Sequence, residues 1–318
     1  MIAAGVVIGW HDGGVDVVLE LSAVIVAVRN DVPYVLTVQS GDKPGLPSGV
    51  FDPDADRSLD QAMRRWANER TGLQLGFVEQ LYTFGDFGRD PLAARQGERR
   101  ISVAYLAFVR DGEPLPELDA MWTNAYDLLP WEDRRLGEPE LVSQQIAPAL
   151  ASWVDTALDR DQRDGRALRA DLSWGLAGAT WDPVRVLERY ELLFEIGLVG
   201  EAGTSAAAKL GTTATLDHRR ILASALGRVR GKLTYRPVVF ELLPSTFTLL
   251  QLQRVVESLV GEPLHKQNFR RLVEGGGLVE GTAQRAETSS GRPAELFRFR
   301  REVLRERPAP GLGLPGRR

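Results

Sequence analysis

The residues best placed to do chemistry lie in the segment Leu46 to Leu73, LPSGVFDPDADRSLDQAMRRWANERTGL. Its second half has helical spacing, so positions 66, 69 and 70 share one helix face. Glutamates at such positions would supply the hard oxygen ligands that Mg²⁺ requires. The residues here are Trp66, Glu69 and Arg70. Only one carboxylate is present, and Arg70 would repel the ion.

Glu69 and the acidic loop before it also have explanations that need no metal. Arg65 lies four residues before Glu69 and can form a helix-face ion pair worth about 0.2–0.5 kcal/mol. The loop contains Asp52, Asp54 and Asp56, which either hold a cation or form a solvated turn. We favour the ion pair and the turn, and we therefore predict no metal site and no catalytic residues.

Two arginines are candidates for binding a phosphate group. Arg89 follows the strand-like segment EQLYTFGDF, and its guanidinium can clamp a phosphate. The alternative for Arg89 is a salt bridge within its own loop. Arg57 lies just before the predicted helix and is the second candidate phosphate contact.

Composition sets the outer limits. The chain has 318 residues, 43% hydrophobic and 26% charged, enough for one large domain or two to three modest ones. No apolar run approaches the ~20 residues needed to span a bilayer, and the N-terminus lacks a signal peptide's basic leader. We therefore expect a cytoplasmic protein with no membrane contact. The absence of cysteine excludes disulfides, thiol nucleophiles and cysteine-ligated zinc.

Charge is distributed unevenly along the chain. Residues 1–216 contain 20 Lys and Arg against 33 Asp and Glu, whereas residues 217–300 contain 14 against 8. The tail 301–318 adds 5 against 2. An acidic body with a basic C-terminal module indicates a nucleic-acid contact at one end.

The elements that must position these residues fall into three segments. Residues 1–150 are expected to form an α+β domain. AVIVAVRNDVPYVLTVQ predicts two strands joined at a turn that contains Asn30 and Asp31, and RRISVAYLAFVRDG predicts another strand. Between them, the helix should run from Leu59 to Thr71 and end at Gly72, which can cap it.

Residues 151–216 predict a helical insert followed by a linker, GEAGTSAAAKLGTTATLD. The helix should begin at Asp182-Pro183. Its apolar stripe is formed by Val184, Leu187, Tyr190, Phe194 and Leu198. We expect Trp174 and Trp181 to pack against the first domain or a second subunit, with a ligand-binding role as the alternative.

Residues 217–305 have the order helix, short strand, helix, turn, helix and hairpin. DHRRILASALGRVRGKL predicts an amphipathic helix, and LTYRPVVFELLP predicts an extended segment. Thr248 and Gln251 match a capping box that opens the next helix, whose apolar face would comprise Leu249, Leu252, Val256 and Leu259. This order is typical of a winged helix-turn-helix.

The second helix of that unit, in HKQNFRRLVEGGG, should place Phe269, Leu272 and Val273 inward. The outward residues are then Lys266, Gln267, Asn268, Arg270 and Arg271, with Arg292 near the tip of the hairpin. Arginine, lysine and glutamine are suited to phosphates and base edges. The alternative is a small helical packing domain with a solvated basic face. RNA binding is less favoured because no RRM-like or KH-type motif is present.

A resemblance to a known family follows from two stretches. QLYTFGDFGRDP with RRISVAYLAFV, and FELLPSTFTLLQLQ with NFRR and GRPAELFRF, resemble the Nudix-related transcriptional regulators of the NrtR type. The helical insert is similar to the NadQ subgroup. The resemblance implies a Nudix-like α/β/α sandwich that senses a ligand, joined to a winged helix that binds palindromic operator DNA as a homodimer.

The motif of the family's enzymes is R-E-U-x-E-E-x-G-U, in which U is an aliphatic residue, and it falls on residues 65–73 of this chain. The glutamate that precedes this motif in the enzymes falls on Arg57. The spacing from Gly49 to Arg65 is two residues longer than in the enzymes. The resemblance therefore implies a repressor of NAD-metabolism genes that binds NAD, ADP-ribose or ATP as an effector, without a cofactor. The alternative is a divergent Nudix pyrophosphohydrolase that acts on an ADP-ribose-like substrate.

Overall fold

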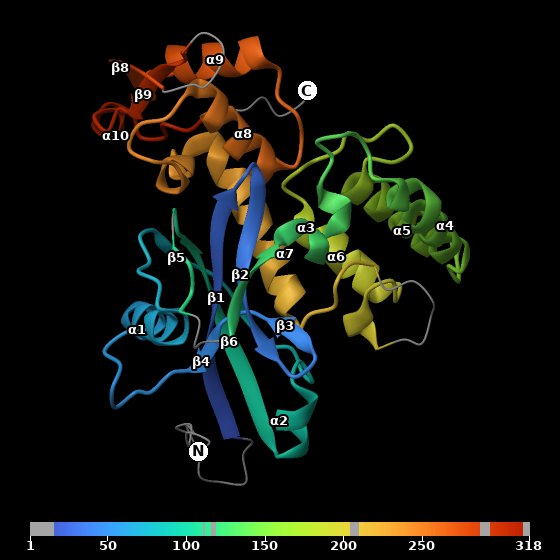
Figure 1. Ribbon diagram of the computed structural model, residues 1–318. Helices are drawn as coiled ribbons and strands as arrows, with labels where there is room; N and C mark the ends of the chain where they lie inside the picture. The colour runs from blue at the N-terminus through green and yellow to red at the C-terminus, as the bar shows by residue number, and fades with distance from the viewer. Residues whose placement is uncertain (1–15, 111, 116–118, 204–209, 287–292, 314–318) are drawn as a thin grey trace.

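The computed structural model describes residues 16–110, 112–115, 119–203, 210–286 and 293–313 (Figure 1). Its strands are β1 (Asp16–Arg29), β2 (Val32–Ser40), β3 (Lys43–Gly45), β4 (Ser48–Val50), β5 (Val78–Phe84), β6 (Glu98–Phe108), β7 (Ala120–Asn124), β8 (Val279–Arg285) and β9 (Glu295–Phe299). Its α-helices are α1 (Leu59–Thr71), α2 (Pro91–Arg95), α3 (Ala125–Leu128), α4 (Ala147–Asp155), α5 (Arg160–Trp174), α6 (Val186–Glu195), α7 (His218–Tyr235), α8 (Leu249–Val260), α9 (Lys266–Gly275) and α10 (Val303–Glu306).

A mixed sheet forms the centre of the N-terminal part. Its strand order is β3-β2-β1-β6-β5, with β4 paired to β1 and β7 paired to β2. The β1–β2 turn is where the sequence places it, and both Asn30 and Asp31 have positive φ. Asparagine and aspartate tolerate that conformation better than most residues, which explains why this dipeptide joins the strands.

Helix α1 covers one face of the sheet, and its predicted bounds are confirmed. Ser58 caps its start by accepting a hydrogen bond from the backbone N–H of Gln61, and Gly72 ends it with a φ of 73°. Its inward residues, Ala62, Met63, Trp66 and Ala67, pack with the odd-numbered β1 residues Leu21, Ala23 and Ile25. The first-domain helix is therefore specified by local capping and by one apolar face.

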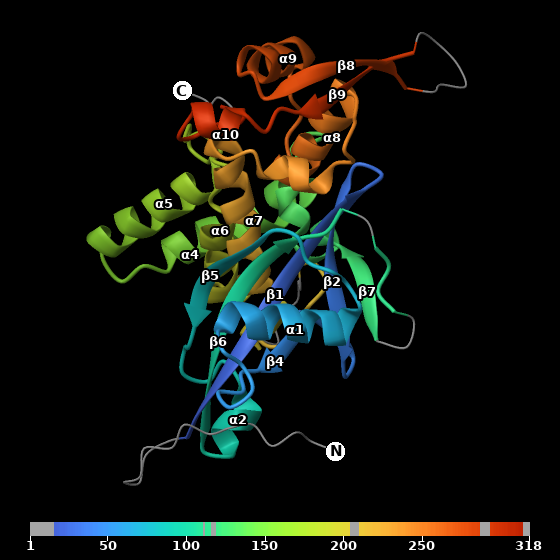
Figure 2. The same ribbon diagram turned by 90° about the vertical axis from the view of Figure 1, so that its left-hand side faces the viewer.

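Helix α7 covers the other face of the sheet and contacts β1, β5 and β6 (Figures 1 and 2). Its inward residues belong to a core that also contains the even-numbered β1 residues Val24 and Val26 and the apolar side chains of α8 and α9. The sheet between α1 and α7 makes the expected α/β/α sandwich. Because α7 also contacts α8, the sandwich and the C-terminal unit share one continuous core.

In the helical insert, the last helix begins later along the chain than predicted and buries a partly different face. Helix α4 spans the expected boundary at residue 150, and α6 begins at Val186 rather than at Asp182, whose side chain caps an earlier turn by accepting from the Val184 N–H. Val184 and Phe194 are exposed, so the predicted stripe is wrong at these two positions, whereas Leu187, Tyr190 and Leu198 lie in or against the core as predicted. The buried face of α6 instead comprises Val186, Arg189, Tyr190, Leu192 and Leu193. A buried arginine at a core position is what an apolar pattern cannot reveal.

Trp174 and Trp181 of the insert lie in the core. Of the two interpretations given for them, packing and ligand binding, the structure agrees with packing. Trp174 packs between Trp131 and Trp181, with ring centroids 6.4 Å apart in each pair. Trp131 lies in the 3₁₀ turn Pro130–Glu132 that follows α3. The insert is thus joined to the end of the N-terminal sandwich by an aromatic cluster.

The C-terminal unit has the predicted winged-helix order, with one correction. Residues 233–244 are not extended, because 233–235 form the last turn of α7 and Val238–Leu242 form a 3₁₀ helix. This turn buries Val239 and Leu242, so packing overrides the strand preference of its β-branched residues. The capping box at Thr248 and Gln251 is confirmed in both of its hydrogen bonds.

Candidate functional site

The α1 face that would hold a metal is filled by an aromatic ring. Trp66 is 7% exposed, and its indole lies so close to β4 that a Cβ added to Gly49 would meet its Nε1 at 1.7 Å. Among the described residues, the indole N–H has no hydrogen-bond partner. Trp66 thus takes up the space between α1 and β4, which requires glycine at position 49.

The remaining acids on this face are tied to an arginine. Arg65 bonds Asp56 at 2.7 Å and Glu69 at 3.1 Å. The hydrogen bond to Asp56 has the larger effect on the pKa of Arg65, and it raises that pKa together with the hydrogen bond to Glu69. The Asp52 side chain accepts from the backbone N–H groups of Asp54 and Ala55, so the acidic loop is a turn.

No group of three or more His, Asp or Glu side chains that could hold a metal occurs in the part of the chain that the structure describes. Mg²⁺ needs near-octahedral oxygen ligands. The residues on this face do not provide them, because Trp66 is apolar and Glu69 is engaged by Arg65. Helix α1 of this chain therefore does not fit the metal that enzymes with the resembling motif require.

Arg89 is buried in a salt-bridge cluster. Its guanidinium bonds Asp217 at 2.7 Å and Glu20 at 3.4 Å, and its side chain is 2% exposed. Burial opposes its charge, but the hydrogen bonds and charges of Asp217 and Glu20 prevail and raise its pKa. The predicted alternative, a salt bridge, is what the structure contains, although its partner comes from the start of α7. A phosphate would have to displace a carboxylate to reach Arg89.

The start of α7 also holds the loop before β4. The Nδ1 of His218 accepts a hydrogen bond from the Leu46 N–H at 2.8 Å, and the Thr215 N–H donates to the Pro44 carbonyl at 2.9 Å. Burial, opposed in part by Asp217, lowers the pKa of His218 to about 4. Neutral His218 is the form that accepts this hydrogen bond, so α7 and the Leu46 loop are joined at neutral pH.

Arg57, the other predicted phosphate contact, is exposed just before α1. It lies at the α1 face of the sheet, whereas Arg89 bonds Asp217, the residue that precedes α7. The structure does not bring Arg57 and Arg89 together into one phosphate site.

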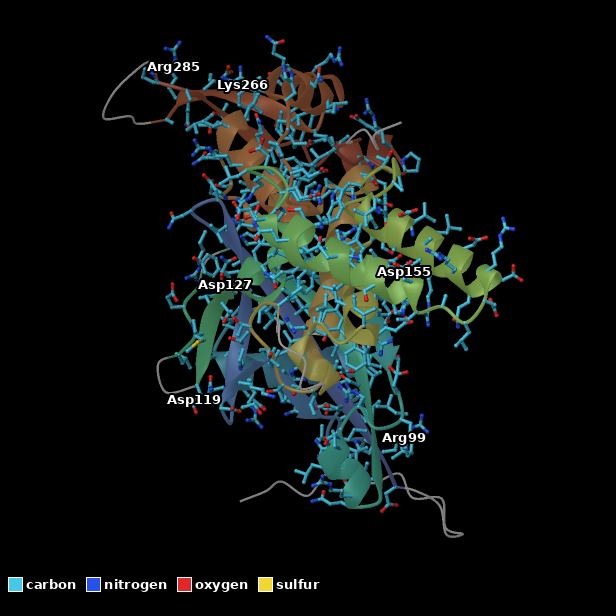
Figure 3. All side chains as sticks on the ribbon, turned by 90° about the vertical axis from the view of Figure 1, so that its right-hand side faces the viewer. Arg99, Asp119, Asp127, Asp155, Lys266 and Arg285 are labelled. Carbon is cyan, nitrogen blue, oxygen red and sulfur yellow. The ribbon has the colours of Figure 1, made fainter. Side chains whose placement is uncertain are left out.

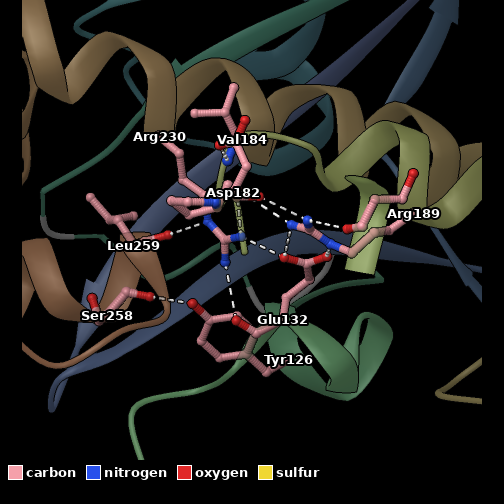
Figure 4. Close-up of polar contacts among 10 residues, drawn as sticks. Tyr126, Glu132, Asp182, Val184, Arg189, Arg230, Ser258 and Leu259 are labelled. Atoms are coloured by element: carbon pink, nitrogen blue, oxygen red, sulfur yellow. Dashed lines mark hydrogen bonds and ion pairs between the residues drawn. The ribbon is translucent and has the colours of Figure 1, made fainter. Parts of the chain in front are cut away.

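A buried ion cluster connects the sandwich, the insert and the C-terminal unit (Figure 4). Glu132 is bound by Arg189 at 2.7 Å and by Arg230 at 2.5 Å, and all three side chains are at most 1% exposed. Burial alone would raise the pKa of Glu132, but the two arginines lower it. Arg230 also donates from Nε to the Leu259 carbonyl, and the Tyr126 hydroxyl donates to the Ser258 carbonyl. The C-terminal end of α8 is thereby fixed to α7 and to the end of the sheet domain.

The predicted recognition helix is α9, and its orientation agrees with the sequence. Phe269 and Val273 are buried and Leu272 is half-buried. The five predicted DNA-contacting residues of this helix, Lys266, Gln267, Asn268, Arg270 and Arg271, are all exposed. Figure 3 shows Lys266 at the same end of the molecule as Arg285.

The turn between α8 and α9 is set by Glu257. Its carboxylate accepts from the Leu264 N–H at 2.8 Å and from the Gln253 side chain at 2.9 Å. Gly261 ends α8 with a φ of 77°. These contacts fix the angle at which α9 leaves α8.

A groove of about 590 Å³ lies between α9 and the wing formed by β8 and β9. Arg270, Gln284 and Arg285 line it. Gln284 and Arg285 were not predicted as DNA contacts from the sequence. Their position on the strand that follows the recognition helix could have indicated them. Arg292, predicted at the wing tip, lies outside the described residues.

Comparisons with known proteins agree with this arrangement. Residues 19–142 match the NUDIX domain, and residues 239–299 match the NrtR DNA-binding winged helix domain. The ADPR responsive transcriptional repressor NtrR of Acinetobacter baylyi is 39% identical over 287 residues, which cover 88% of this chain and 81% of the relative. The chain belongs to the NrtR family.

Solved structures show the same fold as this NrtR-family member. Shewanella oneidensis NrtR complexed with a 27mer DNA has 22% identity and a TM-score of 0.55, covering 90% of this chain and 94% of that one. A MutT/nudix family protein from Enterococcus faecalis has 17% identity and a TM-score of 0.53, covering 92% and 89%. The predicted α+β fold, with a Nudix-like sandwich and a winged helix, is confirmed.

Family membership makes this protein a DNA-binding transcriptional regulator, as predicted. The NadQ-like subgroup stays a prediction. The two family models match the chain on either side of residues 143–238, where the insert and α7 lie. Within the described ranges, every helix falls short of the length and apolarity that a membrane span requires.

Proposed function

We propose that this protein represses transcription in response to ADP-ribose or a related nucleotide, which its Nudix-like domain binds and does not cleave. The observation that carries the proposal is Trp66 seated on Gly49, which removes the metal site while the DNA-reading face of α9 stays exposed. The printed name of the Acinetobacter baylyi relative, an ADPR responsive repressor, supports the choice of effector. Genes of NAD metabolism remain the predicted targets, and a palindromic operator read by a homodimer remains the predicted site.

The buried cluster at Arg89 supports a route for the signal. A nucleotide phosphate that binds Arg89 would compete with Asp217, the residue that precedes α7. Helix α7 runs from this cluster to Arg230, which bonds Glu132 and the Leu259 carbonyl of α8. Releasing one end of α7 would therefore alter the placement of α8 and α9. A ligand changes DNA affinity only by its differential affinity for the two placements.

The test is fluorescence anisotropy with duplexes taken from upstream of the protein's own and neighbouring genes, with and without ADP-ribose, NAD or ATP. We expect specific binding that one nucleotide changes by about five- to 150-fold, as a coupling of about 1–3 kcal/mol implies. The same mixtures, with Mg²⁺ or Mn²⁺ added, should contain only intact nucleotide by chromatography. Turnover that disappears in Glu69→Gln would instead establish the pyrophosphohydrolase alternative.

The Asp217→Asn variant tests the route. Asparagine keeps the shape of the side chain but removes the charge that competes with a phosphate, so nucleotide affinity should rise. The matched control is Asp60→Asn, which changes an exposed ion pair on α1 and should leave affinity unchanged. Equal nucleotide affinities for wild type and Asp217→Asn would exclude Arg89 as the phosphate contact and leave Arg57 as the candidate.

A further inference from the structure

Strand β8 of the wing contains a bulge in its pairing with β9. Gly281 pairs with Phe297 and Arg285 pairs with Glu295, so four steps along β8 correspond to two steps along β9. Strand β8 therefore has two more residues than β9 in this interval, and the extra residues leave the regular ladder. A bulge bends its strand and changes the direction of the side chains that follow it.

The backbone of the bulge adopts a conformation that its residue disfavours. Ala283 has a φ of 59°, in the left-handed region where glycine is the usual residue. The Thr282 hydroxyl holds the bulge, because it donates to the Leu296 carbonyl at 2.9 Å and accepts from the Gln284 N–H at 3.3 Å. Backbone strain of this kind persists only where the surrounding structure fixes it, and it is concentrated at functional sites.

The bulge places consecutive residues of β8 along the groove between the wing and α9. Side chains of a regular strand alternate between its two faces. Ala283, Gln284 and Arg285 nevertheless all line this groove, whose other wall includes Arg270 of α9. Figure 3 shows Arg285 at the end of the molecule that also presents Lys266. The bulge therefore brings a cation of the wing to the side of the recognition helix.

Arg285 has no acidic partner inside the wing. Glu295 lies opposite it on β9, but the carboxylate of Glu295 is turned toward Gly281, where an added Cβ would meet its Oε1 at 2.6 Å. Neither Glu295 nor any other acid of the described chain forms an ion pair with Arg285. Glu274 and Glu295 also line the groove, so a phosphate is attracted to the arginines and not to the groove as a whole.

We propose that the bulge at Ala283 directs Arg285 to a phosphate of the duplex whose bases α9 reads. Ala283 and Thr282 are positioning residues, and Arg285 is the group that contacts DNA. A phosphate contact beside the recognition helix fixes the register of the protein on the duplex. The inference deepens the proposed function and rests on it, because it applies only to a protein that binds duplex DNA.

The test is fluorescence anisotropy of the full-length protein with a labelled random-sequence duplex of about 30 base pairs, which is about three helical turns. Ala283→Val should lower the affinity about tenfold, because a β-branched residue disfavours positive φ and Arg285 then loses its direction. The slope of log affinity against log salt should fall by about one, as for the loss of one phosphate contact. Ala283→Gly should bind like wild type, since glycine adopts positive φ freely.

The Arg285→Ala variant distinguishes positioning from a general loss of structure. It should reproduce the loss seen in Ala283→Val, and the double variant should bind no more weakly than either single variant. Ala177→Val is the matched control, because Ala177 also has a positive φ, of 48°, but is exposed in the helical insert; it should bind DNA like wild type. Losses that add in the double variant, or wild-type affinity in Ala283→Val, would overturn the proposal. So would an Ala283→Gly protein as weak as Ala283→Val.

Thr282 provides a second test that leaves Ala283 in place. Thr282→Val removes the hydroxyl that holds the bulge and should weaken binding with the same fall in salt dependence, whereas Thr282→Ser keeps the hydroxyl and the affinity. Equal affinities of these two variants would contradict the inference. No titration contains a nucleotide, so failure here is distinguishable from failure of the ADP-ribose response. A wild-type protein without affinity for the duplex would refute both.

Discussion

At the scale of single residues, Trp66 makes a position on α1 part of the hydrophobic core. A carboxylate at this position would need solvent and an ion, whereas the indole packs on Gly49 and on the apolar side of the sheet. We therefore expect Trp66→Ala to lower the free energy of unfolding by about 3–5 kcal/mol, the usual range for a buried tryptophan. Urea denaturation measures this. Arg70→Ala, on the exposed side of α1, should change it by less than about 0.5 kcal/mol.

His218 should make stability depend on pH. Its pKa in the folded protein is about 4, below the ordinary value of 6.5, so the unfolded chain takes up a proton first as pH falls. Stability is retained above pH 6.5 and is lost between pH 6.5 and 4, by about 3 kcal/mol in total. His218→Gln should remove this part of the acid dependence in denaturation curves recorded across that range. The exposed His265→Gln variant should behave like wild type; if the two variants titrate alike, His218 is not the responsible group.

Arg270 and Lys266 should contribute differently to DNA binding. Arg270 lines the groove between α9 and the wing, so we assign it to a base edge, and Lys266 to a phosphate. Arg270→Ala should weaken specific binding by about 1–3 kcal/mol and relax preference at one base pair. Lys266→Ala should weaken binding to all sequences and lower the salt dependence. An Arg270→Ala protein that keeps the wild-type ratio of specific to random affinity would contradict this assignment.

At the scale of elements, the Glu132 cluster decides how α6, α7 and α8 meet. Removing one partner of a buried ion pair leaves an uncompensated charge and costs about 3–5 kcal/mol. Glu132→Ala would leave both Arg189 and Arg230 without their shared carboxylate, so thermal and urea denaturation should show a loss in that range. Glu188→Ala on the exposed face of α6 is the matched control and should have little effect. Equal stability of the two variants would show that the cluster adds nothing to the fold.

At the scale of the whole molecule, the cations of the basic C-terminal region fall into two groups, those that pair with acids elsewhere in the chain and those that stay exposed. Among the described residues, five cations from the basic C-terminal region pair with acids outside it. Arg219 pairs with Glu201, Arg220 with Asp86 and Glu191, Arg230 with Glu132, Lys232 with Glu79, and Arg254 with Asp31. Part of the charge asymmetry therefore joins the domains, and the cations of α9 and the wing that stay exposed are the predicted DNA contacts.

This joining predicts reciprocal coupling between the nucleotide and the DNA. If the effector changes operator affinity by about 1–3 kcal/mol, operator DNA must change effector affinity by the same amount. Titration calorimetry of the nucleotide against free protein and against the protein–operator complex measures both. Identical nucleotide affinities in the two titrations would leave the Nudix-like domain as a scaffold without a sensing role.

Several elements were predictable from sequence because the residues that specify them are neighbours. Helix α1 has its cap at Ser58 and its end at Gly72, and α8 begins at the Thr248–Gln251 capping box. The inward and outward faces of α9 follow from helical spacing over a single helix. That positions 66, 69 and 70 carry a single carboxylate is likewise evident from the sequence, and the lack of a metal site stays a prediction.

Only the tertiary structure decided which distant groups meet. Arg89 was equally suited to a phosphate or a carboxylate, and its partner Asp217 lies 128 positions away. Arg230 and Glu132 are separated by 98 positions, and Leu46 and His218 by 172. The residues next to a charged side chain in the sequence do not indicate which distant group it will pair with. Its burial depends on the packing of the whole chain, and this is why α6 has an arginine in the core where its apolar pattern predicted a different face.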